Sequence, residues 1–325
     1  MSTKIRLFSK LLLILLLSFQ FTHAMADAGK VFNVKGTAVI NGSELRSGDT
    51  VNEGDIIKTA NNSSVQIIMK DRTVLDLNEN TRFQVSKYSY NKDKPAKNKS
   101  SFTLLKGAFR YISGLIAKNR PQNVQISAGT ATIGIRGSFD TISFDGTTIT
   151  VNTSIGKATI TLPDGSTVTV TKGQTGTINV STGASSVNPT TTQDPVAVAA
   201  AAIAENPNDP AAVKAALSNL SDADAIVAIA VLMNNAANYG IDSAALVSIV
   251  GNATAANPKL ATALAFVSSA LDPENSDSYK NTILENKPDD STDDADDTSA
   301  VRDASSSGKA LGGGGGGGGT GASPS

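Results

Sequence analysis

The stretch SAGTATIGIRGSF, residues 127–139, interrupts a strand-like run with three glycines and one arginine. A phosphate-binding loop needs the pattern G-x-x-x-x-G-K-[ST] between a strand and a helix. Gly129 and Gly134 have that glycine spacing, but Ile135 occupies the lysine position and strand-like residues follow. The dinucleotide-binding fingerprint fails because it needs the same missing helix. The stretch therefore does not fit a nucleotide-binding loop, and it favours a bent strand.

The strand interpretation places Ile133, Ile135 and Phe139 on one face. Ile142 and Phe144 then continue the apolar face on even positions. Because side chains alternate between the two faces of a strand, this change of parity predicts an extra residue. The simplest form is a β-bulge between Phe139 and Ile142.

Two glycines of the stretch, Gly134 and Gly137, flank Ile135 and Arg136. Glycine inside a strand permits a sharp bend or a close approach of another backbone. Arg136 falls on the face opposite Ile135, where it points to solvent or bonds carbonyls or a carboxylate at the bend. We therefore assign a structural role to the motif Gly134, Arg136, Gly137 and Phe139, with ligand contact by Arg136 as the alternative.

Short alternating apolar runs separated by turns extend over residues 31–180. KATITLPDGSTVTVTKG, residues 157–173, shows two alternating runs joined by Pro163-Asp164-Gly165, which is typical of a hairpin. A second turn is expected at Asp145-Gly146. Many short strands without intervening helical patterns predict an all-β sandwich or coiled-sheet domain.

Alanine dominates the sequence from Val196 to Leu271, with helical spacing. Helix starts are predicted where an N-cap residue precedes proline, or where Ser and Asp form a capping-box-like pair. These starts are Asp194-Pro195, Asp209-Pro210, Asn257-Pro258 and Ser221 with Asp224. Gly240 and Gly251 suit helix ends. We expect five or six short helices packed as a small all-α array.

The chain begins with Lys4, Arg6 and Lys10, continues with an apolar stretch over residues 11–21, and then has Ala24-Met25-Ala26. This is the pattern of a secretory signal peptide cleaved after Ala26, and the apolar stretch is too short for a spanning helix. We expect an exported protein of the periplasm, cell surface or medium, with no transmembrane span in its mature form.

The acidic PDDSTDDADD and an unbroken run of glycine from 312 to 319 end the chain. Neither buries enough apolar area to offset the entropy of ordering, so both are expected to be disordered. A calcium site there lacks the glycine and distal glutamate of an EF-hand. The predicted organisation is signal peptide 1–26, β domain 27–180, linker 181–193, helical region 194–286 and disordered acidic and polyglycine tail 287–325.

The catalytic repertoire of the mature chain is narrow. The chain has no cysteine, and its one histidine, His23, lies inside the predicted signal peptide. Ser-His-Asp and Cys-His catalysis, and histidine or thiolate metal sites, are therefore excluded from the mature chain. A carboxylate-based glycan hydrolase stays open through four aspartates, although turn chemistry accounts for Asp71 and Asp145: Asp71, Asp76, Asp140 and Asp145. We expect no enzyme, no cofactor site and no metal site.

Charge is unevenly distributed along the chain. Residues 27–180 hold 19 basic and 12 acidic residues, whereas residues 181–325 hold 6 and 17. The loop NKDKPAKNKSS concentrates four lysines around Pro95: Lys92, Lys94, Lys97 and Lys99. The loop is interpreted as an exposed hairpin tip, either a solvated surface or a patch that attracts an anionic partner. An acidic glycan, a lipid head group and the acidic tail of the chain itself are the alternatives.

Several runs resemble one known family in the correct order. They are GTAVINGSELRSGDTVNEGDIIKT with its two Gly-Asp turns, SSVQIIMKDRTVLDLNENTRFQV, LLKGAFRYISG, NVQIS and ATIGIRGSF. The last is similar to the A-x-x-G-[VI]-R-G-T-x-F signature of the FecR domain, with Ser138 in place of Thr. The resemblance covers about residues 31–180 and implies an extracytoplasmic all-β module.

The best-known FecR proteins join this module to a membrane span and a cytoplasmic segment that controls a sigma factor. Here only ten residues precede the apolar stretch, too few to fold as a sigma-binding domain. We therefore expect an exported, non-catalytic FecR-domain binding or scaffold protein of the bacterial cell envelope, with a protein or glycan partner and no nucleic acid. The alternative is a surface or extracellular assembly protein that uses the helical region and tail. A signalling regulator and a glycan hydrolase are ranked below both, and self-association stays open.

Overall fold

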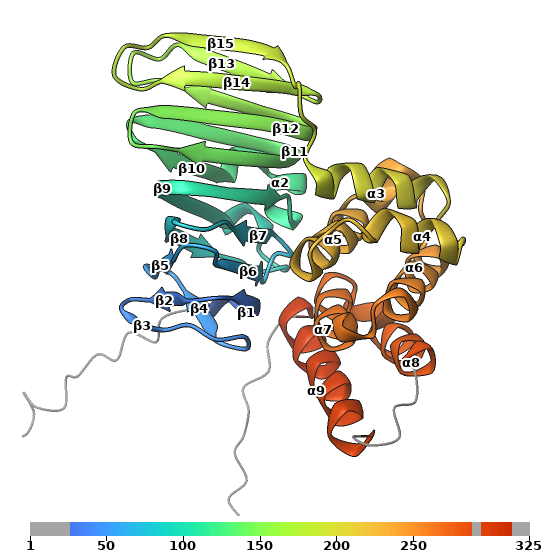
Figure 1. The fold of residues 1–325 in the computed structure, drawn as a ribbon. Helices are drawn as coiled ribbons and strands as arrows, with labels where there is room; N and C mark the ends of the chain where they lie inside the picture. Colours follow the sequence, from blue (N-terminus) through green and yellow to red (C-terminus); the bar gives the residue numbers. More distant parts are fainter. Residues whose placement is uncertain (1–26, 288–293, 314–325) are drawn as a thin grey trace, which may run out of the picture.

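A computed structural model describes residues 27–287 and 294–313 of the chain. A large mixed β-sheet domain, residues 27–189, is followed by helices across residues 195–312. Figure 1 shows the strands stacked in one column with the helices beside it. This arrangement confirms the predicted coiled-sheet domain followed by a helical array. The predicted signal peptide, residues 1–26, lies outside the described residues.

Fifteen strands form one sheet. They are β1 (Asp27–Lys35), β2 (Ala38–Ile40), β3 (Ser43–Glu44), β4 (Thr50–Asn52), β5 (Ile56–Thr59), β6 (Ser64–Met69), β7 (Val74–Leu77), β8 (Arg82–Ser89), β9 (Lys99–Ile112), β10 (Val124–Ala128), β11 (Ala131–Phe144), β12 (Thr148–Thr161), β13 (Thr167–Thr171), β14 (Gln174–Asn179) and β15 (Ser185–Pro189).

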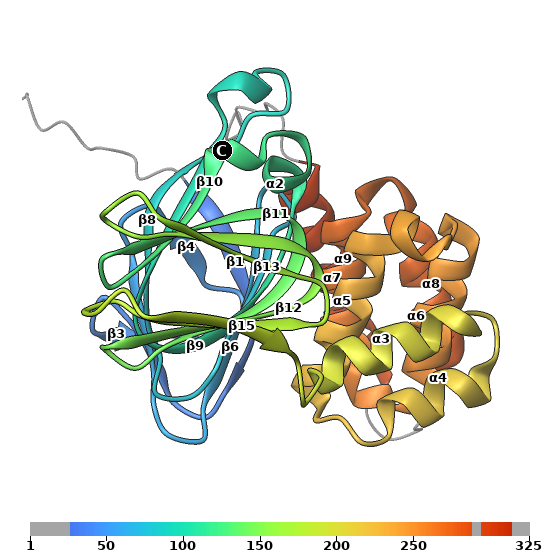
Figure 2. The ribbon, with the colours of Figure 1, turned by 90° about the horizontal axis from the view of Figure 1, so that it is seen from above.

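The main path through the sheet runs β15-β14-β12-β11-β10-β9-β7-β6-β1-β4. β13 pairs with β12, β8 pairs with β9 and β5, and β2 joins β5 to β3. β10 runs parallel to β9, whereas its other neighbour, β11, is antiparallel. Figure 2 looks along the column and shows the sheet coiling around an interior.

Apolar side chains from every second strand position fill that interior. Phe83 lies at its centre, with ring centroids 5.4 Å from Phe102 and 4.9 Å from Phe109. All three rings are fully or almost fully buried. Because offset and edge-to-face aromatic pairs add to the burial of apolar area, this cluster ties β8 to β9.

Both predicted turns are confirmed. Ile160 of β12 lies opposite Val168 of β13, and the intervening turn contains Gly165 with a φ of +84°. In the turn between β11 and β12, Gly146 has a φ of +108° and the Asp145 carboxylate accepts bonds from two following backbone N–H groups. Glycine tolerates these positive φ values, which explains its place in each turn.

The predicted linker 181–193 is wrong in part, because β15 lies inside it. Residues 185–189 pair with β14 along the edge of the sheet, with Val187 opposite Gly176. The Val187 side chain also packs against the interior core. Val187 is the one apolar residue among polar neighbours, so the sequence showed no alternation that would predict a strand. The strand forms because the free edge of β14 offers hydrogen-bond partners to its backbone.

Three short helical turns, η1 (Pro95–Lys97), α2 (Leu115–Asn119) and η2 (Pro121–Asn123), lie within the β domain. The helices that follow are α3 (Pro195–Glu205), α4 (Pro210–Leu217), α5 (Asp222–Tyr239), α6 (Ser243–Ala256), η3 (Pro258–Leu260), α7 (Ala261–Leu271), η4 (Pro273–Asn275), α8 (Ser276–Asn286) and α9 (Asp294–Gly312).

The predicted helix starts are all N-caps, at Asp194, Asp209, Ser221 and Asn257, and each side chain accepts a bond from a backbone N–H of the first turn. Gly240 ends α5 with a φ of +67°, as predicted. The prediction for Gly251 was wrong, because this residue lies inside α6. A Cβ there would approach the Thr282 side chain of α8 to 2.5 Å, so glycine allows the two helices to pack closely.

The predicted disorder of residues 287–325 was wrong over α9. This helix packs against α7, and Gly308 lies so close to the carbonyl oxygen of Phe266 that a Cβ would overlap it. Gly312 lies equally close to the carbonyl of Ala270. Small residues at helical spacing let the two backbones approach, which supplies the packing that the polar composition did not suggest. The polyglycine beyond residue 313 lies outside the described residues.

A second core joins the helices to one outer face of the sheet. Phe32, Ile112 and Phe139 of the sheet are buried against the apolar faces of the helices. The rings of Phe32 and Phe266 stack with centroids 6.4 Å apart. Among the described residues, no helix combines the length and apolar character that crossing a membrane requires.

Substituting Gly308→Val should lower the free energy of unfolding by about 1–3 kcal/mol, because overpacking forces α9 away from α7. Urea denaturation measures the loss, and hydrogen exchange at the amides of α9 should increase. Ser307→Val is the matched control, because Ser307 is exposed on the same helix. Equal stability of the two variants would contradict the close packing of α9.

Candidate functional site

The four motif residues lie on β11 and do not converge on one site. Gly134 has no positive φ, and an added Cβ would meet only the Thr159 carbonyl oxygen at 3.8 Å. Arg136 is exposed, and within the described residues its side chain forms no hydrogen bond or ion pair. Gly137 has a φ of +58°, whereas Phe139 is fully buried.

The change of face in β11 comes earlier than predicted. Ile135 and Ile142 both point into the interior of the sheet, but Phe139 packs in the core beneath the helices. The register shifts between Arg136 and Phe139, where three steps on β11 match two on β12. The predicted common face of Ile135 and Phe139 is therefore wrong, because the bulge at Gly137 precedes Phe139 rather than following it. A second shift, between Phe139 and Asp140, falls inside the interval where the bulge was predicted, but there one step on β11 matches two on β12, so the extra residue lies on β12.

The bulge depends on a glycine in the opposite strand. Gly156 of β12 has a φ of +78°, and an added Cβ would lie 2.5 Å from the carbonyl oxygen of Gly137. No other residue fits that contact without moving the backbone. The paired glycines therefore bend both strands at the point where β11 turns Phe139 toward the helices.

Asp140 lies just after the bulge and is fully buried inside the sheet. Its carboxylate accepts a bond from the Thr153 hydroxyl at 2.6 Å and a second from the Ser138 hydroxyl. Burial raises the pKa of Asp140 to about 7, although both hydroxyl bonds oppose the rise. The carboxylic acid form is therefore favoured in the folded protein below neutral pH.

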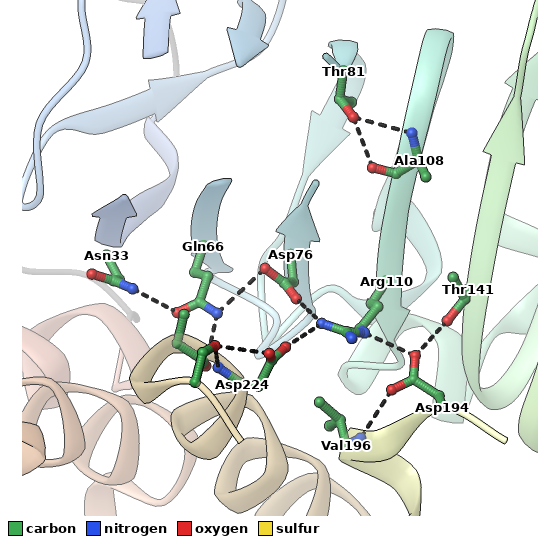
Figure 3. A network of polar contacts seen from close by, with 12 residues as sticks. Asn33, Gln66, Asp76, Thr81, Ala108, Arg110, Thr141, Asp194, Val196 and Asp224 are labelled. Atoms are coloured by element: carbon green, nitrogen blue, oxygen red, sulfur yellow. Dashed lines mark hydrogen bonds and ion pairs between the residues drawn. The ribbon is translucent and has the colours of Figure 1, made fainter. Parts of the chain in front are cut away.

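The strongest polar feature lies between the sheet and the helices, around Arg110 of β9. Its Nη1 lies 2.7 Å from Asp76 of β7 and 2.6 Å from Asp224 of α5, and its Nε lies 2.8 Å from Asp194. Figure 3 shows the three carboxylates gathered around one guanidinium. We call Arg110, Asp76, Asp194 and Asp224 the arginine cluster.

Secondary bonds fix the carboxylates of the arginine cluster. Asp194 accepts bonds from the Thr141 hydroxyl and from the backbone N–H of Val196, so it also caps α3. The Gln66 amide donates to Asp76 and to the Ala223 carbonyl oxygen, 2.9 Å away in the helical array. Burial disfavours the charge of Arg110, but the neighbouring carboxylates outweigh it and raise its pKa.

A polar hollow of about 340 Å³ adjoins the arginine cluster. Besides three residues of the cluster, its lining includes Lys35, Asn62, Asn78, Glu79 and Ser221. Within the described part of the chain, no group of three or more acidic or histidine side chains is arranged to hold a metal ion. The hollow lies at the junction of the β domain and the helices. The charges of the arginine cluster there are already paired with one another.

The lysine hairpin, which we define as residues 92–99, joins β8 to β9. Its four lysines, Lys92, Lys94, Lys97 and Lys99, are all exposed. Across residues 27–287 and 294–313, none of them forms an ion pair with an acidic side chain. Figure 2 shows the hairpin in teal, projecting from the β domain at the top of the view.

The base of the lysine hairpin borders a second polar hollow of about 310 Å³. The hollow is lined by two lysines and several amide side chains: Lys97, Lys99, Asn98, Gln122, Asn123 and Gln125. Asn98 is buried and rigid, because its amide oxygen accepts a 2.7 Å bond from the Asn91 backbone. Lysines beside amide side chains form a surface that attracts anions and offers hydrogen-bond donors.

The four aspartates considered for glycan hydrolysis all have structural partners. Asp71 accepts bonds from Thr73 and Tyr88, and Asp145 holds a turn. Asp76 belongs to the arginine cluster, and Asp140 is held by its two hydroxyl donors.

Arg110 was missed by sequence reasoning, which used its segment only for the family resemblance. The sequence did contain a usable signal. Arg110 lies between Ala108 and Ile112 on the same face of the strand, and a charged residue between apolar neighbours indicates a face that other elements cover. Asp194 and Asp224 were recognised only as helix-start residues. Their common partner is 84 and 114 residues away, beyond the range of local patterns.

Replacing Arg110 by Met should lower the free energy of unfolding by about 3–5 kcal/mol, because three buried or half-buried carboxylates lose their counter-charge. Urea denaturation measures the change. Arg82→Met is the control, because Arg82 is exposed and pairs with no acidic residue within the described part of the chain. Matching losses in the two variants would contradict the importance of the arginine cluster.

Asp140 should make the protein less stable as pH rises from about 4 to about 7. The raised pKa means that the folded state holds a proton that the unfolded state has already released. A rise from 3.8 to about 7 corresponds to about 4 kcal/mol at most. Asp140→Asn should flatten this pH dependence in urea titrations and stabilise the protein near pH 7.

Asp145→Asn is the matched control for Asp140. Backbone N–H groups of Thr148 and Thr147 lower the pKa of Asp145, so its contribution is present above its ordinary pKa and lost in acid. This variant should leave the slope between pH 4 and 7 unchanged. A steep slope that survives in Asp140→Asn would contradict the assignment.

Part of the chain matches one known protein family. Residues 55–159 match the family model described as FecR protein. Two crystal structures of a candidate anti-sigma factor from Parabacteroides distasonis are similar at 13% and 14% identity, with TM-scores of 0.35 and 0.34. Each likeness covers 41% of this chain and 59% of the other, and no curated protein matches. The chain therefore carries a FecR domain, as the ordered motifs of its sequence predicted.

Proposed function

We propose that this chain is an exported, non-catalytic binding or scaffold protein of the bacterial cell envelope. Its FecR domain contacts a negatively charged protein or glycan partner through the lysine hairpin. The observation that carries this proposal is the combination of four exposed lysines, which pair with no acidic side chain among the described residues, and a polar hollow at their base. The FecR match supports an interaction role for the domain.

The position of the lysine hairpin favours contact with a large partner. The helices cover one outer face of the sheet, whereas the hairpin projects from the β domain beyond the strands. Exposed lysines are long and mobile, so they attract a partner over distance rather than fix one geometry. The amide side chains that line the adjoining hollow supply the shorter-range contacts.

A non-catalytic role is supported by the chemistry of the mature sequence. The proposed cleavage after Ala26 removes the one histidine, and the chain has no cysteine. The aspartates nearest the motif are engaged in structural bonds. Export itself is testable, because the protein recovered from the envelope fraction or the medium should begin at Asp27.

Replacing Lys92, Lys94, Lys97 and Lys99 together by Gln should weaken retention of envelope components by about fivefold or more at low salt. The reason is the loss of four positive charges from one hairpin, whose attraction acts over about 10 Å at 0.1 M salt. The measurement is pull-down from an envelope extract and from purified acidic polysaccharide, repeated at rising ionic strength. Wild-type binding should fall with salt.

The control replaces four exposed lysines elsewhere, Lys58, Lys106, Lys214 and Lys259, and so makes the same change in net charge. This control should retain its partners. Equal loss in both variants would show that net charge, not the lysine hairpin, determines binding. Absence of any retained protein or glycan at low salt would overturn the proposed function.

A further inference from the structure

β13 is an edge strand with one unpaired side. It pairs with β12, and no strand of residues 27–287 pairs with its other side. Figure 1 places it at the end of the column that also holds β14 and β15. Its sequence, TVTVT, has high strand propensity and no charge, and Thr167, Thr169 and Thr171 are exposed. A free edge of this kind presents a row of backbone donors and acceptors to another strand.

Two other edge strands, β3 and β15, carry protective features. At the opposite end of the column β3 has two residues, and Glu44 pairs with Arg46 at 2.7 Å, both exposed. β15 ends in Pro189, which has no backbone N–H to donate. Shortness, charge and proline are the devices that keep strand edges from pairing. β13 has none of these three devices along its five residues, and of its backbone groups the Thr171 N–H is occupied, by the side-chain oxygen of Gln174 at 3.0 Å.

The sequence of β13 is a palindrome. When two copies pair antiparallel about Thr169, Thr167 of one lies opposite Thr171 of the other, and Val168 lies opposite Val170. Identical residue types then lie opposite each other on both faces of the sheet. The threonines lie on the outer face, and the valines lie on the face that lines the interior. Such self-complementarity is what a two-fold interface requires, because the same patch must serve both subunits.

The charges that flank β13 complement each other in the same pairing. Asp164 precedes the strand, Lys172 follows it, and both are exposed. Antiparallel pairing places Lys172 opposite Ser166 of the second copy, two residues from its Asp164. In the described part of one copy, neither side chain forms an ion pair. Two symmetric Lys–Asp contacts therefore favour this register over shifted ones.

We propose that β13 pairs antiparallel with β13 of a second copy, in a register centred on Thr169. The sheets of the two subunits become continuous across a two-fold axis. The dimer carries two lysine hairpins, so a repetitive envelope partner can be held at two points. The dimer itself does not depend on the function proposed for the hairpin.

Disulfide trapping tests the register, because the chain has no cysteine of its own. Residues directly opposite in an antiparallel pair have Cβ atoms about 4.5–5.5 Å apart, close to disulfide geometry. Thr169→Cys should form a covalent dimer on mild oxidation. Thr167→Cys and Thr171→Cys should each crosslink poorly alone and efficiently when mixed. Thr147→Cys, exposed in the turn before β12, is the control and should stay monomeric.

Sedimentation equilibrium of the full chain measures the dimer directly. Thr169→Lys places two like charges face to face at the axis and should raise the dimer dissociation constant about tenfold or more. Thr147→Lys adds the same charge elsewhere and should leave it unchanged. Circular dichroism checks that both variants are folded.

Three results would overturn the proposal. One is a wild-type chain that stays monomeric throughout the micromolar range. Another is a dimer that Thr169→Lys does not weaken, which would place the interface in the helical region or elsewhere. The third is failure of the mixed cysteine pair to crosslink, which decides the question even if Thr169→Lys does not fold. Loss of envelope binding by the lysine-hairpin variant is a separate outcome and leaves the dimer untouched.

Discussion

Arg110 joins the two parts of this chain through one guanidinium. Its contacts reach β7 through Asp76, the start of α3 through Asp194, and α5 through Asp224. Asp194 is the central residue, because one oxygen binds Arg110 and Thr141 while the other caps α3. A charged group that is buried away from water must have its hydrogen bonds and counter-charges satisfied. The arginine cluster is satisfied only when the helices pack on the sheet in this one orientation. Phe32 and Phe139 then complete the apolar contact around it.

This placement determines which surfaces of the FecR domain are available. The helices occupy one outer face of the coiled sheet, and the apolar groups there are buried. The lysine hairpin and the outer side of β13 lie elsewhere on the domain. In the described chain the hairpin lysines pair with no acidic side chain, and no strand pairs with the outer side of β13. They differ in character, since one is a charged hairpin and the other a backbone edge. The first suits a charged partner of varied shape, and the second suits another strand.

The motif around Arg136 acts on the fold rather than on a ligand. The Gly156 backbone contacts the Gly137 carbonyl so closely that no side chain fits at position 156, and the bulge turns Phe139 out of the interior. The next residue, Asp140, is thereby directed inward, where burial raises its pKa. The one extra residue in β11 therefore has two consequences. It directs the Phe139 ring toward the helices, and it directs the Asp140 carboxyl group into the interior of the sheet. The arginine that marks the motif stays exposed.

The sequence by itself determined the β character of the first part, the hairpin at Pro163, the helix caps and the order of the two parts, because these follow from alternation, turn residues and capping within a few residues. It missed β15, whose pairing depends on the free edge of β14. It misjudged Gly251 and α9, where small residues serve contacts between helices distant in the chain. It also misplaced the face of Phe139, since the partner strand decides where a bulge falls. The arginine cluster could not be predicted from the sequence. Its members are up to 114 residues from Arg110, and only tertiary packing brings such charges together and removes the water between them.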